Sequence, residues 1–250
     1  MMLMWFLVGV LGAIMGSFIS MLVYRIPRQE EIVFKPSHCP SCQHPLGVFS
    51  LIPILSFMMQ KGVCRYCSKA ISLRYFLCEI ACLFLFLLCF WAYGLSFLFI
   101  KTVFFLSAMV LLWAIDWTHF ILPDVVTLPL IVLGLALGTW EGRGLEMILA
   151  TVVGFGVYFL IGVLAKWIYK KEAMGMGDMK LGAAIGAWWG LHFVILSIYL
   201  SFLIGGLVGI ILIVGGFKKK TDYIPFGPAM ILASVLVLWV GETLWALIFG

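Results

Sequence analysis

Eight apolar segments run through this chain of 250 residues, and they constrain its fold more than any other feature. A helix needs about 20 apolar residues to cross the hydrocarbon layer of a bilayer. Hydrophobic residues make up 64% of the chain and charged residues only 11%, whereas a soluble domain is usually about 25% charged. We therefore predict an all-α polytopic membrane protein with about eight transmembrane helices. The segments are 2–24, 73–93, 97–115, 121–140, 145–169, 180–189, 192–217 and 226–249.

Basic residues orient these segments, because cytoplasmic loops of membrane proteins carry an excess of Lys and Arg. With segment 25–72 in the cytoplasm and the helices alternating, every basic residue except Lys101 and Arg143 lies inside. Both termini then lie outside. No basic residue precedes the first apolar segment, so we expect a retained helix rather than a cleavable signal peptide. The net charge of +5 is accounted for by this topology, and we expect no nucleic-acid partner.

Four cysteines in the polar segment have the spacing of a zinc site. Cys39 and Cys42 form one C-x2-C pair, and Cys64 and Cys67 form a second. Two such turns present four thiolates to one metal ion. Disulfides are the weaker interpretation in a reducing cytosol, and a thiol redox pair is another alternative. Four cysteine ligands leave no open position for a catalytic water, so we predict structural zinc in a segment too small to bury its own core.

This zinc site suggests three parts of the chain. Residues 1–24 are the first transmembrane helix, 25–72 a cytoplasmic zinc-binding domain, and 73–250 a membrane domain of about seven helices. His38 and His44, beside the first cysteine pair, are interpreted as solvated loop residues. Three further cysteines are expected to be small buried apolar residues of the second helix, where a free thiol packs well: Cys78, Cys82 and Cys89.

Asp116 and Asp178 end or precede apolar segments, and both fall on the cytoplasmic side of the predicted topology. A carboxyl group beside a bilayer is costly, so its presence points to function. Two close carboxyls cannot both ionise cheaply, so one keeps a proton while the other stays charged. Such a pair can activate a water and protonate a carbonyl oxygen. This predicts an aspartyl protease within the membrane; two structural helix-end acids are the alternative.

Several neighbours of these acids are candidates for supporting roles. Gly175 and Gly177 allow a positive φ or a close backbone approach beside Asp178. Asp124 follows Pro123 and is either an ordinary helix start or a catalytic support. Elsewhere, Glu79 lies about two turns into the second helix, where it should pair, with Arg74 for example, or serve function.

Taken together, these residues make the chain similar to the type IV prepilin peptidases, bifunctional leader peptidases and N-methyltransferases of bacterial pilus and type II secretion systems. The resemblance runs nearly end to end and includes both cysteine pairs. The other motifs that carry it are Gly16-Ser17-Phe18-Ile19-Ser20, Tyr24-Arg25-Ile26-Pro27, Ile52-Pro53-Ile54-Leu55-Ser56, Ile71-Ser72-Leu73-Arg74-Tyr75, Asp116 to Asp124, Gly175-Met176-Gly177-Asp178-Met179-Lys180 and Ile224-Pro225-Phe226-Gly227-Pro228.

The resemblance implies that Asp116 and Asp178 are the catalytic pair of a GxGD-type protease in the bacterial inner membrane. It implies that prepilins or pseudopilins are cleaved at the cytoplasmic face, after a Gly that ends a basic leader. The new amino terminus would then be methylated with S-adenosylmethionine. Weaker assignments are catalytic support by Asp124, Gly175, Gly177 and Lys180, and methyl transfer by Gly62 and Glu79.

Two other function classes remain open at this point. A transporter or proton relay would also use membrane acids, although transporters place them near the midplane and often contain repeats. A zinc-stabilised scaffold without chemistry would tolerate replacement of both Asp116 and Asp178. Neither the oligomeric state nor the pathway that is served, whether pilus assembly, secretion or DNA uptake, is indicated by the sequence.

Overall fold

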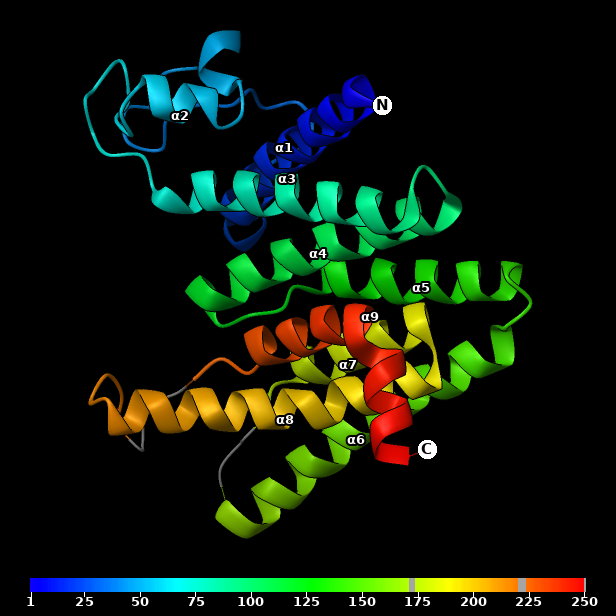
Figure 1. Ribbon diagram of the computed structural model, residues 1–250. Coiled ribbons are helices and arrows are strands. Elements are labelled where there is room, and N and C mark those ends of the chain that lie inside the picture. The colour runs from blue at the N-terminus through cyan, green and yellow to red at the C-terminus, as the bar shows by residue number, and fades with distance from the viewer. Residues whose placement is uncertain (171–173, 220–223, 250) are drawn as a thin grey trace. The chain divides into compact units, whose positions relative to one another are not determined.

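The computed structural model describes residues 1–170, 174–219 and 224–249, and this part of the chain is helical with short connections (Figure 1). Lys171 and Lys220, two of the basic residues predicted to lie inside, are outside the described residues. The chain divides into two compact units, Met1–Ile115 and Asp116–Gly250. The elements are α1 (Met2–Arg25), η1 (Ile26–Arg28), η2 (Val48–Leu51), α2 (Leu55–Met59), α3 (Leu73–Tyr93), α4 (Phe97–His119), α5 (Asp124–Trp140), α6 (Gly144–Tyr169), α7 (Met176–Trp189), α8 (Leu191–Val214) and α9 (Gly227–Phe249).

Each predicted apolar segment corresponds to one of the longer helices, but these helices do not all have the length of a membrane span. Among the described residues, α1, α3, α4, α6, α8 and α9 are long and apolar enough to cross a bilayer. By contrast, α5 has 17 residues and α7 has 14, fewer than the roughly 20 that a crossing needs. Six of the eight expected crossings are therefore supported by helix length and composition.

The largest differences from the predicted segment bounds are four residues, and both concern the acids. Helix α4 runs past residue 115 to His119, and it ends where Phe120 takes a left-handed conformation, with φ of 55°. Helix α7 begins at Met176 rather than at Lys180, because the Asp178 carboxylate caps its first turn, as described below. Both acids therefore lie inside terminal helical turns, and not in the connections between helices.

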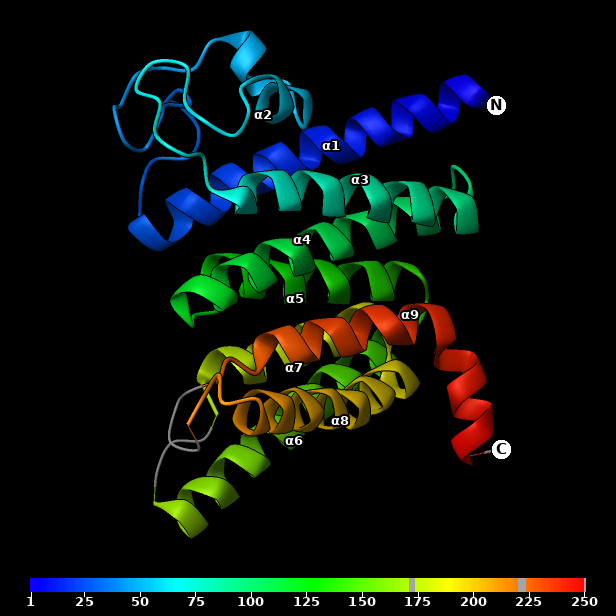
Figure 2. The ribbon, with the colours of Figure 1, turned by 60° about the vertical axis from the view of Figure 1, so that its left-hand side comes forward.

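In the unit Met1–Ile115, α1 lies along α3, as both views of the ribbon show (Figure 2). The two backbones touch: a Cβ atom added at Gly16 would lie 2.5 Å from the Cα atom of Glu79. Near the other end, the rings of Trp5 and Phe90 meet edge to face at 4.9 Å. Cys78, Cys82 and Cys89 are buried along α3, as predicted. Segment 26–72 therefore connects two helices that pack closely against each other.

In the unit Asp116–Gly250, α7 is the buried helix. It contacts α5, α6, α8 and α9, and every residue from Asp178 to Trp188 except Lys180 is buried. Its glycine and alanine residues allow this close packing, as the sequence indicated. The Trp188 indole N–H donates a hydrogen bond of 2.7 Å to the Leu130 carbonyl oxygen of α5. A short helix enclosed by its neighbours therefore carries one of the two candidate acids.

Candidate active site and cysteine centre

Asp178 is held in the first turn of α7 by its own helix start. Its Oδ2 atom accepts a hydrogen bond of 3.1 Å from the Gly175 N–H group, and its own N–H donates to the Gly175 carbonyl oxygen. An acidic side chain at this position satisfies a donor that a helix start otherwise leaves open. Gly175 has a φ of −76°, so the positive φ considered from the sequence is not used there. The carboxylate is nevertheless buried, with 5% of the residue exposed.

Asp116 is buried to the same extent in the last turn of α4. Its carboxyl group interacts with the Gly227 backbone N–H group, although the Oδ2 atom makes no hydrogen bond of standard geometry among the described residues. A buried carboxyl oxygen that is satisfied this weakly is uncommon, and a catalytic role is one explanation. The first residue of α9 lies against this oxygen, since a Cβ atom at Gly227 would be only 2.5 Å from it. A larger residue at this position would therefore displace the Asp116 carboxyl group. The positive end of the α9 dipole faces this carboxyl group.

The two acids come together although they lie far apart in the sequence. The Asp178 charge is near enough to act on Asp116, and Leu122 lies between Gly177, which precedes Asp178, and Gly227, which lies against Asp116. A Cβ atom at Gly177 would lie 2.9 Å from the Cβ atom of Leu122, and one at Gly227 would lie 3.4 Å from its Cδ1 atom. The close approach predicted for Gly177 is thus made to Leu122. The end of α4 and the starts of α7 and α9 converge at this leucine.

Asp124 and Lys180 form a second link beside the acids. The Lys180 Nζ atom bonds both carboxylate oxygens of Asp124, at 2.6 and 2.8 Å. Asp124 is the first residue of α5, as the helix-start interpretation predicts, and Lys180 lies two positions beyond Asp178. The ion pair therefore ties the start of α5 to the first turns of α7.

Within the described part of the unit, no basic side chain forms an ion pair with Asp116 or Asp178. Two buried carboxyl groups without a neutralising partner cannot both ionise cheaply, which favours one protonated and one ionised group. That arrangement suits general acid and base chemistry on a water and a carbonyl group.

The four predicted zinc ligands also come together, in the other unit. Their Sγ atoms all lie within 4.8 Å of one another, and those of Cys39 and Cys67 are 3.9 Å apart. Tetrahedral zinc with bonds of about 2.3 Å requires sulfur atoms about 3.8 Å apart. Among the described residues these cysteines form no disulfide. The donor set and its spacing fit one zinc ion.

Both cysteine pairs lie on turns of the same kind. The N–H of Cys39 donates to the His44 carbonyl and the N–H of Cys64 to the Lys69 carbonyl, at 3.0 and 2.8 Å. Hydrogen bonds from the backbone N–H groups of Tyr66 and Cys67 lower the pKa of the Cys64 thiol to about 7, which favours the thiolate that a metal needs. His44 instead packs its ring on Tyr66 at 3.6 Å.

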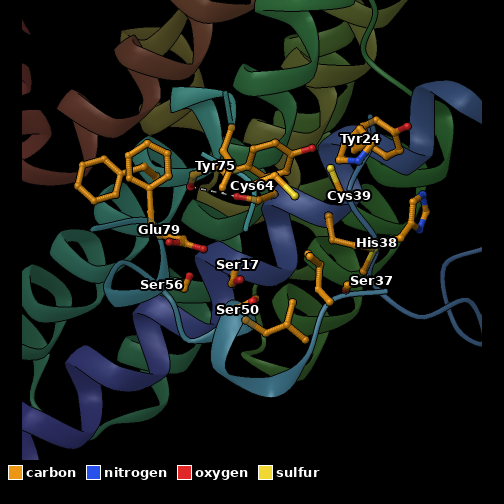
Figure 3. Close-up of a pocket in the computed structure, with 18 of the residues that line it drawn as sticks. Ser17, Tyr24, Ser37, His38, Cys39, Ser50, Ser56, Cys64, Tyr75 and Glu79 are labelled. Atoms are coloured by element: carbon orange, nitrogen blue, oxygen red, sulfur yellow. Dashed lines mark hydrogen bonds between the residues drawn. The ribbon is translucent and has the colours of Figure 1, made fainter. Parts of the chain in front are cut away.

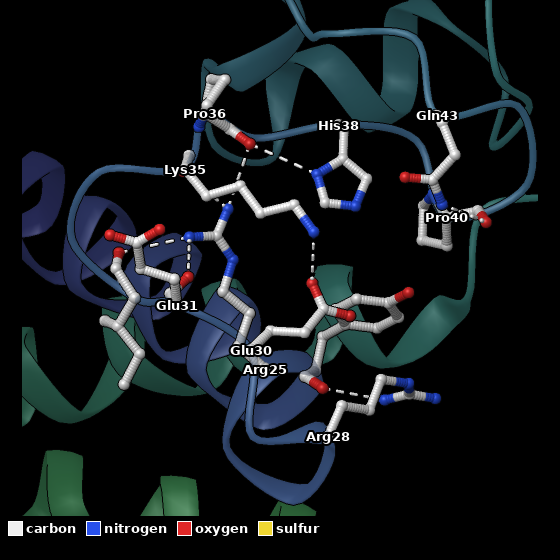
Figure 4. Close-up of polar contacts among 11 residues, drawn as sticks. Arg25, Arg28, Glu30, Glu31, Lys35, Pro36, His38, Pro40 and Gln43 are labelled. Atoms are coloured by element: carbon white, nitrogen blue, oxygen red, sulfur yellow. Dashed lines mark hydrogen bonds and ion pairs between the residues drawn. The ribbon is translucent and has the colours of Figure 1, made fainter.

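The structural role of Arg25 was not predicted from the sequence, in which this residue entered only the topology and the Tyr24-Arg25-Ile26-Pro27 motif. The Arg25 side chain is buried and donates to four backbone carbonyl oxygens at 2.9–3.2 Å (Figure 4). These carbonyls belong to Glu31, Ile32, Lys35 and Pro36. The guanidinium group thereby shapes the segment that leads from α1 to the first cysteine turn. The Tyr-Arg-x-Pro motif after the first helix was the available signal.

Glu79 pairs with a backbone group rather than with Arg74. Its Oε2 atom accepts a hydrogen bond of 2.7 Å from the Ile54 N–H group, while Arg74 donates to the Ser72 hydroxyl. Residues five positions apart do not share a face of a helix, which accounts for the wrong partner. Gly62, the other methyl-transfer candidate, has a φ of +69° in the turn before the second cysteine pair.

Comparisons with known proteins bear on both units. The family described as "Bacterial Peptidase A24 N-terminal domain" matches residues 10–93, and the "Type IV leader peptidase family" matches residues 103–210. A protein of Neisseria gonorrhoeae named prepilin leader peptidase/N-methyltransferase is 32% identical, over 96% of this chain and 91% of its own length. A protein of Pseudomonas putida with the same name is 33% identical, over 96% and 92%. None of the solved structures matches the chain.

Proposed function

Since this chain belongs to the type IV leader peptidase family, we propose that it is a membrane aspartyl endopeptidase and N-methyltransferase. It removes the basic leader of prepilins or pseudopilins after a Gly and then methylates the new amino-terminal residue. The observation that carries the peptidase half is that both acids are buried and that their neighbours converge on Leu122, with Gly177 preceding Asp178 and Gly227 lying against Asp116. The relatives support this reading, and nothing among them supports a transporter.

The proposed cleavage uses the two carboxyl groups in turn. One of them, ionised, takes a proton from a water whose oxygen attacks the scissile carbonyl carbon. The other, protonated, gives its proton to the carbonyl oxygen, and the intermediate then collapses as the leaving nitrogen is protonated. Gly175, Gly177, Asp124 and Lys180 support the pair: the first by its hydrogen bond to Asp178, and the others by fixing the segments around Leu122.

The cysteine centre holds structural zinc in this proposal. Cys39, Cys42, Cys64 and Cys67 would bind it, and the spacing of their sulfur atoms supports that role. The metal supplies cross-links to a segment with little core of its own. It takes no part in cleavage.

The charge pattern and the apolar helices support an assignment to the bacterial inner membrane. The acids and the zinc domain 25–72 then face the cytoplasm, with both termini outside and with 1–24 and 73–250 in the membrane. The shorter helices α5 and α7 would complete eight crossings. The methyl donor is S-adenosylmethionine, which the relatives' shared name favours.

Co-expression with a model prepilin tests the peptidase assignment. Leader removal is followed by gel mobility for the wild type, Asp116→Asn and Asp178→Asn at equal membrane levels. We expect each substitution to abolish cleavage, because amides cannot exchange the required protons. Glu242→Gln is a matched control, since Glu242 is an exposed acid of α9. Retained cleavage in both Asp variants would refute the proposed pair.

A further inference from the structure

A cavity of about 170 Å³ lies between α1, α3 and the cysteine turns (Figure 3). All the residues that line it belong to the unit Met1–Ile115. The proposed peptidase acids are not among them, so cleavage leaves this cavity without a role. Its walls combine aromatic rings, hydroxyl groups and one carboxyl group, including those of Tyr24, Phe57, Phe76, Ser17, Ser56 and Glu79.

Glu79 supplies the carboxyl group. Figure 3 shows it pointing toward the side of the cavity where Ser17 and Ser56 lie. The Ile54 N–H group that bonds it belongs to a residue with φ of 63° and ψ of −54°, a conformation that a β-branched side chain rarely adopts. Such backbone strain collects at ligand-binding sites and is maintained by the surrounding contacts. The chain thus accepts a strained Ile54 in order to fix a buried carboxylate at this wall.

Aromatic rings form another part of the wall. The rings of Phe57 and Phe76 stack at 4.9 Å with an interplanar angle of 22°. The faces of aromatic rings attract cations, and a carboxylate does so more strongly. Two basic side chains line the cavity, and both are engaged by backbone carbonyls: Arg25 by four of them, and His38 by that of Pro36. The cavity is therefore suited to a cationic group on an apolar body with a flat ring.

S-adenosylmethionine combines these features, because it carries a sulfonium cation, an aliphatic chain and an adenine ring. We propose that this cavity binds S-adenosylmethionine, with the sulfonium group facing Glu79 and with Phe57 and Phe76 in contact with the ligand. This inference rests on the methyltransferase half of the proposed function. Sites that enclose a drug-sized ligand measure roughly 300–1,000 Å³, so the smaller cavity encloses part of the donor and leaves the rest at its mouth.

A comparison of two ligands tests the proposed charge contact. S-adenosylhomocysteine lacks the methyl group and has a neutral sulfur atom. Calorimetric titration of the purified full chain in detergent should give tighter binding of S-adenosylmethionine than of S-adenosylhomocysteine. Glu79→Gln should weaken the former about tenfold and the latter less than about twofold, because glutamine keeps an acceptor for the Ile54 N–H group but removes the charge.

Two further variants separate the ring contact from general damage. Phe57→Leu should weaken both ligands about equally, since the rings act on the shared part of the molecule. Glu242→Gln changes an exposed acid of the other unit and should leave both affinities unchanged. Wild-type affinity for S-adenosylmethionine in Glu79→Gln would overturn the proposed contact.

Leader cleavage, measured in the same preparations, keeps the two proposals distinct. Wild-type protein that cleaves the prepilin but binds neither ligand overturns the cavity assignment and leaves the peptidase standing. Protein that binds both ligands as expected but does not cleave supports the cavity and contradicts the peptidase assignment.

Discussion

At the scale of single residues, the contact between Gly227 and Asp116 is the most exacting feature of the proposed active site. An added methyl group would lie 2.5 Å from the Asp116 Oδ2 atom and 3.4 Å from the Leu122 Cδ1 atom. Non-bonded carbon contacts are optimal only at about 3.5–4.0 Å. One of these neighbours must therefore move if Gly227 is replaced.

Gly227→Ala should lower leader cleavage at least about tenfold, because a displacement of a reacting group by ~1 Å costs up to about 100-fold in rate. The variant should still insert in the membrane. Gly209→Ala is the matched control, since nothing lies within 4 Å of its added Cβ atom in α8. Cleavage rates in membranes, normalised to the amount of each variant, test this prediction. Equal rates for the two variants would mean that Gly227 does not limit the site.

The ion pair between Lys180 and Asp124 tolerates more change than the contact between Gly227 and Asp116. The Asp124 side chain is 57% exposed, and pairs of this kind contribute only about 0.2–1 kcal/mol to stability. Lys180→Met and Asp124→Asn should each reduce cleavage a few-fold through the position of Leu122, without unfolding the protein. The double variant should lose little more than either single one, which a double-mutant cycle measures. Fully additive losses would contradict a shared role.

At the scale of elements, the connection from α1 into the cysteine turns depends on Arg25. Arg25→Lys keeps the charge but loses the planar fork that reaches four carbonyl oxygens. We expect zinc to be lost to a chelator about tenfold faster, because hydrogen bonds of a charged donor contribute substantially to stability. Arg28→Lys is the control: Arg28 is more exposed, lies over the Tyr24 ring and donates to one carbonyl. Equal rates of zinc loss would refute the structural role.

Helix α7 illustrates what could be predicted from the sequence at this scale. Its Gly and Ala residues indicated close packing against neighbours, and the structure confirms that packing. The predicted start of α7 was four residues too late, because the segment was drawn from hydropathy alone. Hydropathy does not detect a capping residue, and here Asp178 caps the first turn. Cysteine spacing, by contrast, predicted the four-sulfur cluster, since each turn is a local structure.

Contacts between distant segments could not be predicted. The motif that contains Gly227 was visible in the sequence, but its approach to Asp116 depends on how α4 and α9 pack. The four carbonyl groups that bind Arg25 could not be predicted either. Every residue has a backbone carbonyl group, and only the fold directs these four to one guanidinium group. The Leu122 wedge requires three helix ends to meet, which no local pattern encodes.

At the scale of the whole molecule, the two proposed activities depend on different units. The cysteine cluster and the cavity belong to Met1–Ile115, and the paired acids to Asp116–Gly250. Cys39 and Cys64 line the cavity as well as belonging to the cluster. Removal of zinc with a chelator should therefore abolish binding of S-adenosylhomocysteine and reduce leader cleavage much less. Titration calorimetry and the gel assay on one preparation, before and after zinc is restored, test this. Equal loss of both would contradict separate dependence.

The positions of the acids in terminal turns of α4 and α7 also have a consequence for temperature. Helix ends open at a lower free-energy cost than the middle of a packed helix. Moderate heating should therefore increase the fraction of time in which the two carboxyl groups are displaced from their positions in the site, while the helices stay folded. Cleavage should decline reversibly several degrees below the loss of the helical circular dichroism signal. The upper temperature limit of cleavage would then be set by local disorder at two helix ends. The protein as a whole would unfold only at a higher temperature.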